Sequence, residues 1–196
     1  MARPKDNVKE AKMRSQILNA SKKCFIQHGF HQTSMRQIID GSGISSGGVY
    51  HYFPSKESIV EAISTEEMTD IHFLVGRLQK KDNALDAVTQ FVLDIVGNTP
   101  LKEAILGTEI FAEACRNIQI KEMVGHNNAM LKAALEATIN TGQVKGEIMQ
   151  EMTADELSTF IIALYEGLIG RIAIGDLSSK KAKKIASNSI KNTLRF

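Results

Sequence analysis

Residues 33–56 bring small hydroxyl residues, glycines, aromatic residues and a lysine together in one short stretch, TSMRQIIDGSGISSGGVYHYFPSK. Hydroxyl, phenol, imidazole and ammonium groups can all donate hydrogen bonds to phosphate oxygens. Glycines let a backbone come close to a bulky ligand because they carry no side chain. These residue types therefore favour binding to a nucleic acid over bond-breaking chemistry.

Helix start and stop signals in this stretch predict two short helices joined by a tight turn. Ser34, followed by a glutamine three residues later, has the pattern of a capping box. Residues 41–43 contain two glycines that break the first helix, Ser45 starts the second, and Pro54 ends it. We expect a helix-turn-helix at about residues 34–53, whose second helix enters the major groove of DNA.

The second helix has the features that a DNA recognition helix needs. Its SSGG start at residues 45–48 is small enough to approach base edges, and this approach would justify two glycines that each cost a helix about 1 kcal/mol relative to alanine. Val49 and Tyr50 are expected to pack against the supporting helix, while His51 and Lys56 bind phosphate. The residues expected to contact DNA are Thr33, Ser34, Arg36, Ser45, Ser46, Gly47, Gly48, Tyr50, His51, Tyr52 and Lys56.

About residues 11–65 resemble the N-terminal domain of TetR/AcrR-type transcriptional regulators. The shared elements are a Gly-Phe pair after the first helix, Thr33, the Gly-Ile-Ser turn at 43–45, Gly47, the Tyr-His-Tyr-Phe run at 50–53, and Lys56 followed by Glu57. The resemblance implies a ligand-responsive regulator, most simply a repressor, that binds a palindromic operator as a homodimer and is released by a small-molecule inducer.

Three positions depart from the pattern of that family. Ile39 and Ser42 stand where the family usually has alanines, and Gly48 replaces a common threonine or alanine. Ile39 suggests looser packing between the two helices. Because Gly48 has no side chain to read a base, recognition is expected to depend on Arg36, Ser46 and His51.

The rest of the chain has helical apolar patterns and no strand-like alternation of useful length. Helices are expected at about residues 9–28, 56–78, 85–95, 101–118, 121–140, 154–172 and 179–194, after a loose basic arm at residues 1–8. Gly29 is expected to end the first helix in the left-handed conformation, and Thr153 with Glu156 to form a capping box. The fold class is all-α, with a three-helix DNA-binding domain at residues 1–65 and a larger helical ligand-binding and dimerisation domain at 66–196.

Composition and charge agree with this organisation. Residues 1–62 hold nine Lys and Arg against five Asp and Glu, a net charge of +4, whereas the remainder holds 15 against 17, or −2. A basic end next to a neutral end fits a DNA-facing domain and a regulatory domain. Cys24 and Cys115 each fall in an apolar helical pattern and are interpreted as buried thiols that form no disulfide. No apolar run reaches the length of a membrane span or a signal sequence, so a cytoplasmic protein is expected.

The resemblance also implies an effector cavity and a dimer interface in the C-terminal helices. The candidate effector-binding residues are Phe73, Phe91, Glu109, Phe111, Glu113, Met123, His126, Met130, Tyr165 and Glu166. A buried glutamate among them without a basic partner would favour a cationic effector, because an unpaired buried carboxylate is unfavourable. One apolar seam is predicted to contribute to a four-helix dimer interface. It consists of Leu157, Phe160, Ile161, Leu164, Leu168 and Ile172.

Other functions fit the sequence less well. Residues 43–47 match G-x-S-x-G, which would make Ser45 a hydrolase nucleophile, but no apolar strand precedes them. A dinucleotide-binding loop lacks both that strand and its third glycine. His28 and His31 have no second ligand pair with zinc spacing. We therefore expect no enzyme, metal or cofactor. The remaining alternative is a helical adaptor without specific DNA binding.

Overall fold

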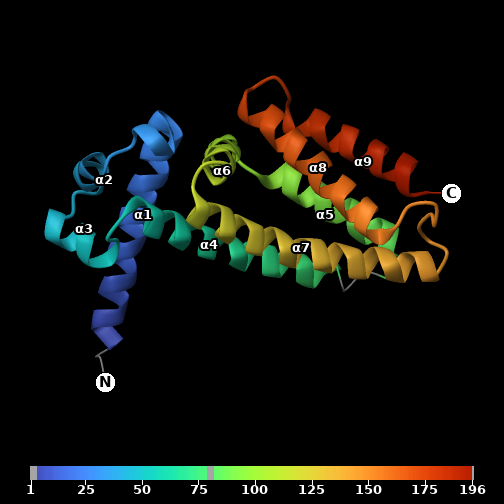
Figure 1. Cartoon of the computed structure of the whole chain (residues 1–196), viewed down its shortest axis with the longest axis horizontal. Coiled ribbons are helices and arrows are strands. Elements are labelled where there is room, and N and C mark those ends of the chain that lie inside the picture. Colours follow the sequence, from blue (N-terminus) through green and yellow to red (C-terminus); the bar gives the residue numbers. More distant parts are fainter. Residues whose placement is uncertain (1–3, 79–81, 196) are drawn as a thin grey trace. The chain divides into compact units, whose positions relative to one another are not determined.

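The computed structural model describes residues 4–78 and 82–195, and within these ranges every regular element is a helix. The predicted all-α class is confirmed. The helices are α1 (Pro4–Gln32), α2 (Met35–Ser42), α3 (Ser46–Tyr52), α4 (Lys56–Leu78), α5 (Ala84–Asn98), α6 (Leu101–Ala114), α7 (Ile118–Val144), α8 (Ala154–Ala173) and α9 (Ser179–Leu194) (Figure 1).

The chain divides into two compact units, each with its own apolar core. Unit 1 consists of Met1–Glu67 and Leu106–Val124, and unit 2 of Met68–Ile105 and Gly125–Phe196. The predicted boundary near residue 65 lies close to the first division, but the sequence pattern does not reveal that residues 106–124 pack with the N-terminal helices. They do so because Leu106, Ile110 and Ile120 are buried in the core of unit 1.

Helix α1 differs from the prediction at both ends. It begins at Pro4, so residues 4–8 belong to the helix and not to a loose arm. Gly29 interrupts the helical backbone with φ 75° and ψ 160°. Its φ is positive, as predicted, but its ψ lies outside the left-handed helical region. A non-glycine residue would be strained in this conformation.

The boundaries of α6 and α7 also differ from the prediction, and the side chain of Asn117 explains the break between these two helices. The helix expected to reach residue 118 ends at Ala114, and the Asn117 side chain accepts hydrogen bonds from the N–H groups of Gln119 and Ile120 at the start of α7. Helix α7 continues beyond residue 140 to Val144. Asn117 is therefore a helix cap that the apolar pattern did not indicate.

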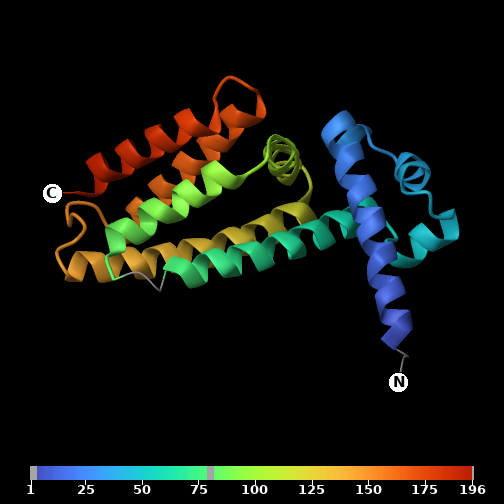
Figure 2. The ribbon, with the colours of Figure 1, turned by 180° about the vertical axis from the view of Figure 1, so that it is seen from behind.

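In unit 2, α5, α8 and α9 lie side by side, as Figure 1 and Figure 2 both show. Phe91 on α5, Leu157 and Ile161 on α8, and Ile190 on α9 are buried together in its core. The amphipathic patterns of the sequence correctly identify these inward-facing positions. The patterns are wrong for Cys115, which is exposed, and Cys24 is only partly buried.

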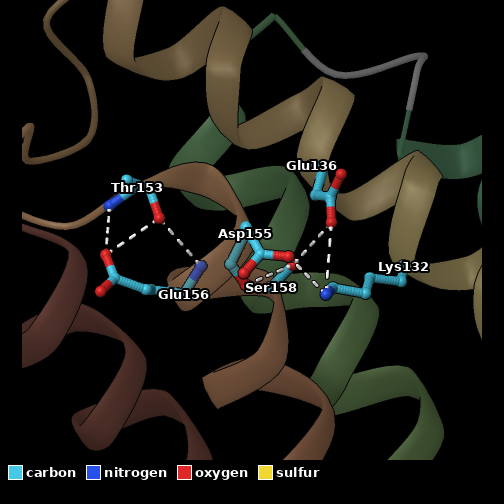
Figure 3. A network of polar contacts seen from close by, with 6 residues as sticks. All are labelled: Lys132, Glu136, Thr153, Asp155, Glu156 and Ser158. Carbon is cyan, nitrogen blue, oxygen red and sulfur yellow. Dashed lines mark hydrogen bonds and ion pairs between the residues drawn. The ribbon is translucent and has the colours of Figure 1, made fainter.

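Polar contacts fix the start of α8 against α7 (Figure 3). Thr153 and Glu156 form the predicted capping box, in which each side chain accepts a hydrogen bond from the other residue's backbone N–H. Lys132 on α7 forms ion pairs with Asp155 and Glu136. The Lys132–Asp155 ion pair links the two helices, and the capping box fixes where α8 begins.

Candidate nucleic-acid interface

The turn between α2 and α3 is built from local hydrogen bonds and one glycine. Ser34 and Gln37 form the predicted capping box at the start of α2. Gly43 ends α2 in the left-handed conformation, with φ 64° and ψ 16°. The buried Ser42 hydroxyl donates to the Ile39 carbonyl and accepts from the Ile44 N–H. This departure from the family pattern therefore stabilises the turn.

Helix α3 has a buried face and an exposed face. Val49 is fully buried, and Phe53, which follows the helix, is 1% exposed, so this side anchors α3 in the core of unit 1. The opposite side presents Ser46, Gly47, Tyr50 and His51, which are all exposed. The prediction that Tyr50 packs inward is wrong, because 48% of its surface is exposed. Val49 and the half-buried Tyr52 anchor the helix instead.

The two glycines of α3 have different surroundings. A Cβ atom on Gly47 would meet nothing within 4 Å, so no contact within the chain requires a glycine there. A Cβ atom on Gly48 would lie 2.8 Å from Ile44 Cγ2 and 3.2 Å from the Ser45 hydroxyl. The absence of a side chain at position 48 therefore preserves the turn and the cap. Close approach to DNA remains an explanation for Gly47 only.

Lys56, which we predicted to bind phosphate, makes contacts within its own chain. Its ammonium donates to the carbonyl oxygens of Phe30 at 2.8 Å and His31 at 3.4 Å, and lies 4.6 Å from the centre of the Phe30 ring. Two of its three N–H donors are thus engaged. Lys56 therefore fixes the last turn of α1, after Gly29.

Several other predicted contact residues also have structural roles. Thr33 is 1% exposed, and its hydroxyl donates to the Gly29 carbonyl, which removes it from any external surface. Ser34 and Ser45 are exposed helix caps. Tyr52 is half-buried, and its hydroxyl donates to the Met13 sulfur.

Arg36 is the most accessible charged side chain among the predicted contact residues. Its side chain is 90% exposed, and its only ion pair among the described residues is a 4.0 Å contact with Asp40. An Arg in this state is able to bind phosphate or a base edge. Among the predicted contact residues, Arg36, Ser46, Tyr50 and His51 have exposed side chains with no structural role described above, and Gly47 exposes its backbone beside them.

Two residues of α1 that the sequence pattern did not single out support this surface. Gln16 donates from its side-chain amide to the Ser42 carbonyl at the end of α2, over 2.7 Å. The Arg14 guanidinium lies 4.7 Å from the centre of the Phe53 ring. Neither position breaks the helical pattern, so only the three-dimensional contacts reveal these roles.

The predicted effector residues are distributed over both units. Phe73, Phe111 and His126 are exposed, which argues against their lining an enclosed site within either unit. Met123 in unit 1 and Met130 in unit 2 are partly buried.

The three glutamates proposed as polar anchors differ in their partners. Glu109 accepts a hydrogen bond from the Phe30 N–H at 3.3 Å, and the buried Glu113 lies 3.8 Å from Arg116. Glu166 is half-buried and forms neither an ion pair nor a hydrogen bond within the described part of the chain. Burial raises the pKa of the Glu166 carboxyl.

The predicted dimer seam is largely occupied within its own unit. Leu157, Ile161, Leu168 and Ile172 are buried in the core of unit 2 and cannot serve as the contact surface for a second chain without unpacking that core. Phe160 and Leu164 remain partly exposed on α8. The apolar pattern could not distinguish core residues from partly exposed ones, because both kinds of apolar residue lie on the same helix.

No group of described residues could hold a metal ion, and no described helix is both long and apolar enough to cross a membrane. A short helix that is anchored on one side, carries small and hydrogen-bonding residues on the other, and follows a tight turn defines the class of helix-turn-helix DNA-binding proteins.

Comparisons with known proteins identify the family. The family model for bacterial regulatory proteins of the tetR family matches residues 17–63, and the model for the C-terminal domain of BetI-type transcriptional repressors matches residues 83–195. The chain belongs to the TetR family of transcriptional regulators.

Individual relatives agree with this assignment. The chain is 30% identical to the HTH-type transcriptional regulator UidR of Escherichia coli K12. The aligned 167 residues cover 84% of each protein. The structure of GusR from Salmonella enterica has a TM-score of 0.78 at 28% identity, with 93% of this chain and 95% of that chain covered. A transcriptional regulator from Saccharomonospora viridis, solved in complex with choline, has a TM-score of 0.80 at 21% identity. The matched region covers 94% of this chain and 98% of that chain.

Proposed function

We propose that this protein is a repressor that binds a palindromic operator as a homodimer and leaves it when a small molecule binds. The observation that carries the DNA-binding part is the exposed face of α3. Ser46, Gly47, Tyr50 and His51 point away from the core, while Val49 fixes the helix from behind. A major groove admits a helix presented in this way.

Direct reading of bases depends on few side chains. Arg36 and His51 can donate hydrogen bonds to base edges or phosphates, and Ser46 and Tyr50 supply hydroxyl groups. We infer that much of the affinity comes from phosphate contacts and that DNA shape contributes to sequence discrimination. Affinity should then fall steeply as the salt concentration rises.

Dimerisation supplies the second half of the recognition surface. One short helix reads only a few base pairs, so two copies about 34–36 Å apart are needed to read a palindrome. We propose that α8 and α9 form the interface, with Phe160 and Leu164 among the contact residues because they are only partly covered in the single chain. The buried members of the predicted seam support α8 from within unit 2 instead.

Effector control follows from a two-state equilibrium. An effector that binds more tightly to a form whose α3 helices are wrongly spaced for adjacent grooves lowers the affinity for DNA. The Saccharomonospora viridis regulator was solved with choline, which supports proposing a small-molecule site in the helical C-terminal part of this chain too. We place the protein in the cytoplasm, where the DNA and the effector are both accessible.

A gel-shift titration with the DNA upstream of the protein's own gene tests this function. We expect a discrete complex at nanomolar protein, a two-fold symmetric footprint, and a steep loss of affinity between 50 and 200 mM salt, about 10³-fold or more for six or more phosphate contacts. Scrambled DNA of the same length is the control. Equal binding to both DNAs, or none to either, would favour the helical adaptor.

A further inference from the structure

Arg14 on α1 carries a positive charge that no acidic residue of its own chain neutralises. The side chain is half-buried, and its guanidinium lies over the Phe53 ring, with Cζ 4.7 Å from the ring centre. Within residues 4–78 and 82–195 it forms neither an ion pair nor a hydrogen bond. Because a phenyl ring offers no oxygen acceptor, the N–H donors of this guanidinium remain available to a ligand.

The other basic side chains of unit 1 differ from Arg14 in how they are held. Lys22 pairs with Glu66, and the Lys56 ammonium donates to the carbonyl oxygens of Phe30 and His31. Three further lysines of α1, at positions 9, 12 and 23, are exposed. Arg14 thus combines two properties that these lysines do not combine, since it is fixed against a ring and still has unused donors.

Contacts between α1 and the end of α3 place this charge next to the recognition helix. Phe53 follows α3 directly, and its backbone N–H donates to the Val49 carbonyl. The Tyr52 hydroxyl donates to the sulfur of Met13, the residue before Arg14. Two consecutive residues of α1 therefore contact the two residues that end α3 and follow it. The charge of Arg14 lies at the same end of α3 as the exposed His51.

The surroundings of Arg14 suit an anion. The described side chains of α1, at residues 8–32, include five Lys and Arg but a single acidic residue. That residue, Glu10, lies one turn before Arg14, is exposed and does not pair with it. An arginine binds phosphate through paired N–H donors. Packing against Phe53 restricts the side chain in advance, so less conformational entropy is lost on binding.

We propose that Arg14 binds a DNA phosphate beside the groove that α3 enters, and that the Phe53 ring holds it in place for this contact. The inference rests on the proposed function and extends the DNA contacts from the helix-turn-helix to α1. It also supplies the phosphate ligand at this end of α3, since Lys56 is engaged within the chain. A base edge is a less suitable partner, because Arg14 is half-buried on α1 and not part of the exposed face of α3.

The salt dependence of DNA binding tests this contact. Arg14→Met removes the charge but keeps an apolar, helix-favouring side chain over Phe53. Each lost phosphate contact should reduce the slope of log affinity against log salt by about 0.9, or about 1.8 for the two subunits of a dimer. Raising the salt concentration from 50 to 200 mM should then cost Arg14→Met roughly tenfold less affinity than it costs the natural protein. Fluorescence anisotropy with the DNA upstream of the protein's own gene measures both slopes.

Two matched variants separate a phosphate contact from a structural role. Arg14→Lys keeps the charge and should keep most of the slope. Arg195→Ala removes an exposed arginine from the end of unit 2 and should leave the slope unchanged. A purely structural Arg14 predicts a different result, in which affinity follows the melting temperature and all variants share one slope. That result would overturn the proposal.

Ethylation interference locates the phosphate. Ethylation removes the charge of a phosphate and prevents a contact there. Binding of the natural protein should be sensitive to ethylation at one phosphate in each half-site at which Arg14→Met is insensitive. Identical interference patterns for the two proteins would contradict the contact.

The same titrations distinguish this inference from the proposed function. If the natural protein bound operator and scrambled DNA equally, the repressor function would fail, but a smaller slope for Arg14→Met would still support the phosphate contact. If specific binding were normal and the two slopes equal, only the assignment of Arg14 would fail. Absence of binding to any DNA would overturn both.

Discussion

The Lys56 ammonium lies 2.8 Å from the carbonyl oxygen of Phe30 and 4.6 Å from the centre of the Phe30 ring. One side chain from the start of α4 therefore holds both the backbone and the ring of a residue at the end of α1. Glu109 holds the same residue through its backbone N–H. The end of α1 that leads into the helix-turn-helix is thus fixed by groups from α4 and α6.

We predict that Lys56→Ala destabilises the protein by about 1–2 kcal/mol, since it removes charge-assisted hydrogen bonds and a cation–π contact. Urea unfolding measures this loss, with Lys23→Ala on the exposed side of α1 as the control. The slope of DNA affinity against salt should stay unchanged. Unaltered stability with a slope reduced by about one would instead make Lys56 mainly a phosphate ligand.

His51→Ala is predicted to affect DNA binding without affecting stability. The ring is exposed at the end of α3, and its only aromatic neighbour among the described residues is Tyr52 at 5.0 Å. Loss of a groove contact should weaken operator binding by about 1–3 kcal/mol, or roughly five- to 160-fold. Fluorescence anisotropy and a thermal melt of the same sample measure both quantities. A lower melting temperature with unchanged affinity would contradict the assignment.

The adjacent glycines of α3 provide a matched pair of variants. Gly47→Ala should stabilise the free protein by about 0.5–1 kcal/mol, because its Cβ atom meets no neighbour and alanine favours the helix. It should nevertheless weaken operator binding by on the order of 1 kcal/mol, because the methyl group lies on the exposed side of α3 that we propose faces DNA.

Gly48→Ala should behave in the opposite way. Its Cβ atom would lie 2.8 Å from Cγ2 of the buried Ile44, and overpacking of this kind costs about 1–3 kcal/mol. Thermal unfolding and DNA titration of the two variants side by side check the contrast. Equal effects of the two substitutions on stability would contradict the different surroundings described for the two glycines.

Local signals in the sequence predicted much of the fold because they act over a few residues. The capping residues Ser34 and Thr153 and the turn glycine Gly43 all have the predicted roles. The family assignment is also confirmed, because its motif lies in one continuous stretch.

Contacts between distant residues could not be predicted in this way. Lys56 and Thr33 have residue types suited to phosphate, but partners in α1 occupy them. Likewise, periodicity shows that Leu157 is apolar but not whether its own unit or a second chain covers it. Burial of Leu157 within unit 2 becomes visible only once α5, α8 and α9 are packed.

The capping box of α8 predicts a specific pH dependence of stability. Hydrogen bonds from the backbone N–H and the hydroxyl of Thr153 lower the pKa of Glu156 below its ordinary value. A lowered pKa in the folded state means that the ionised carboxylate contributes stability above the pKa of the unfolded chain, near 4.3. That contribution is lost as the pH falls through the lower pKa of the folded state.

Glu156→Gln should therefore unfold at lower urea concentration than the natural protein at pH 7. The difference should shrink progressively below about pH 4, as the natural carboxylate becomes protonated and resembles the neutral amide. Glu122→Gln, at an exposed position on α7, should show no such convergence with pH. A difference between Glu156→Gln and the natural protein that stays constant from pH 7 to pH 3 would mean that the charge of Glu156 contributes nothing to the cap.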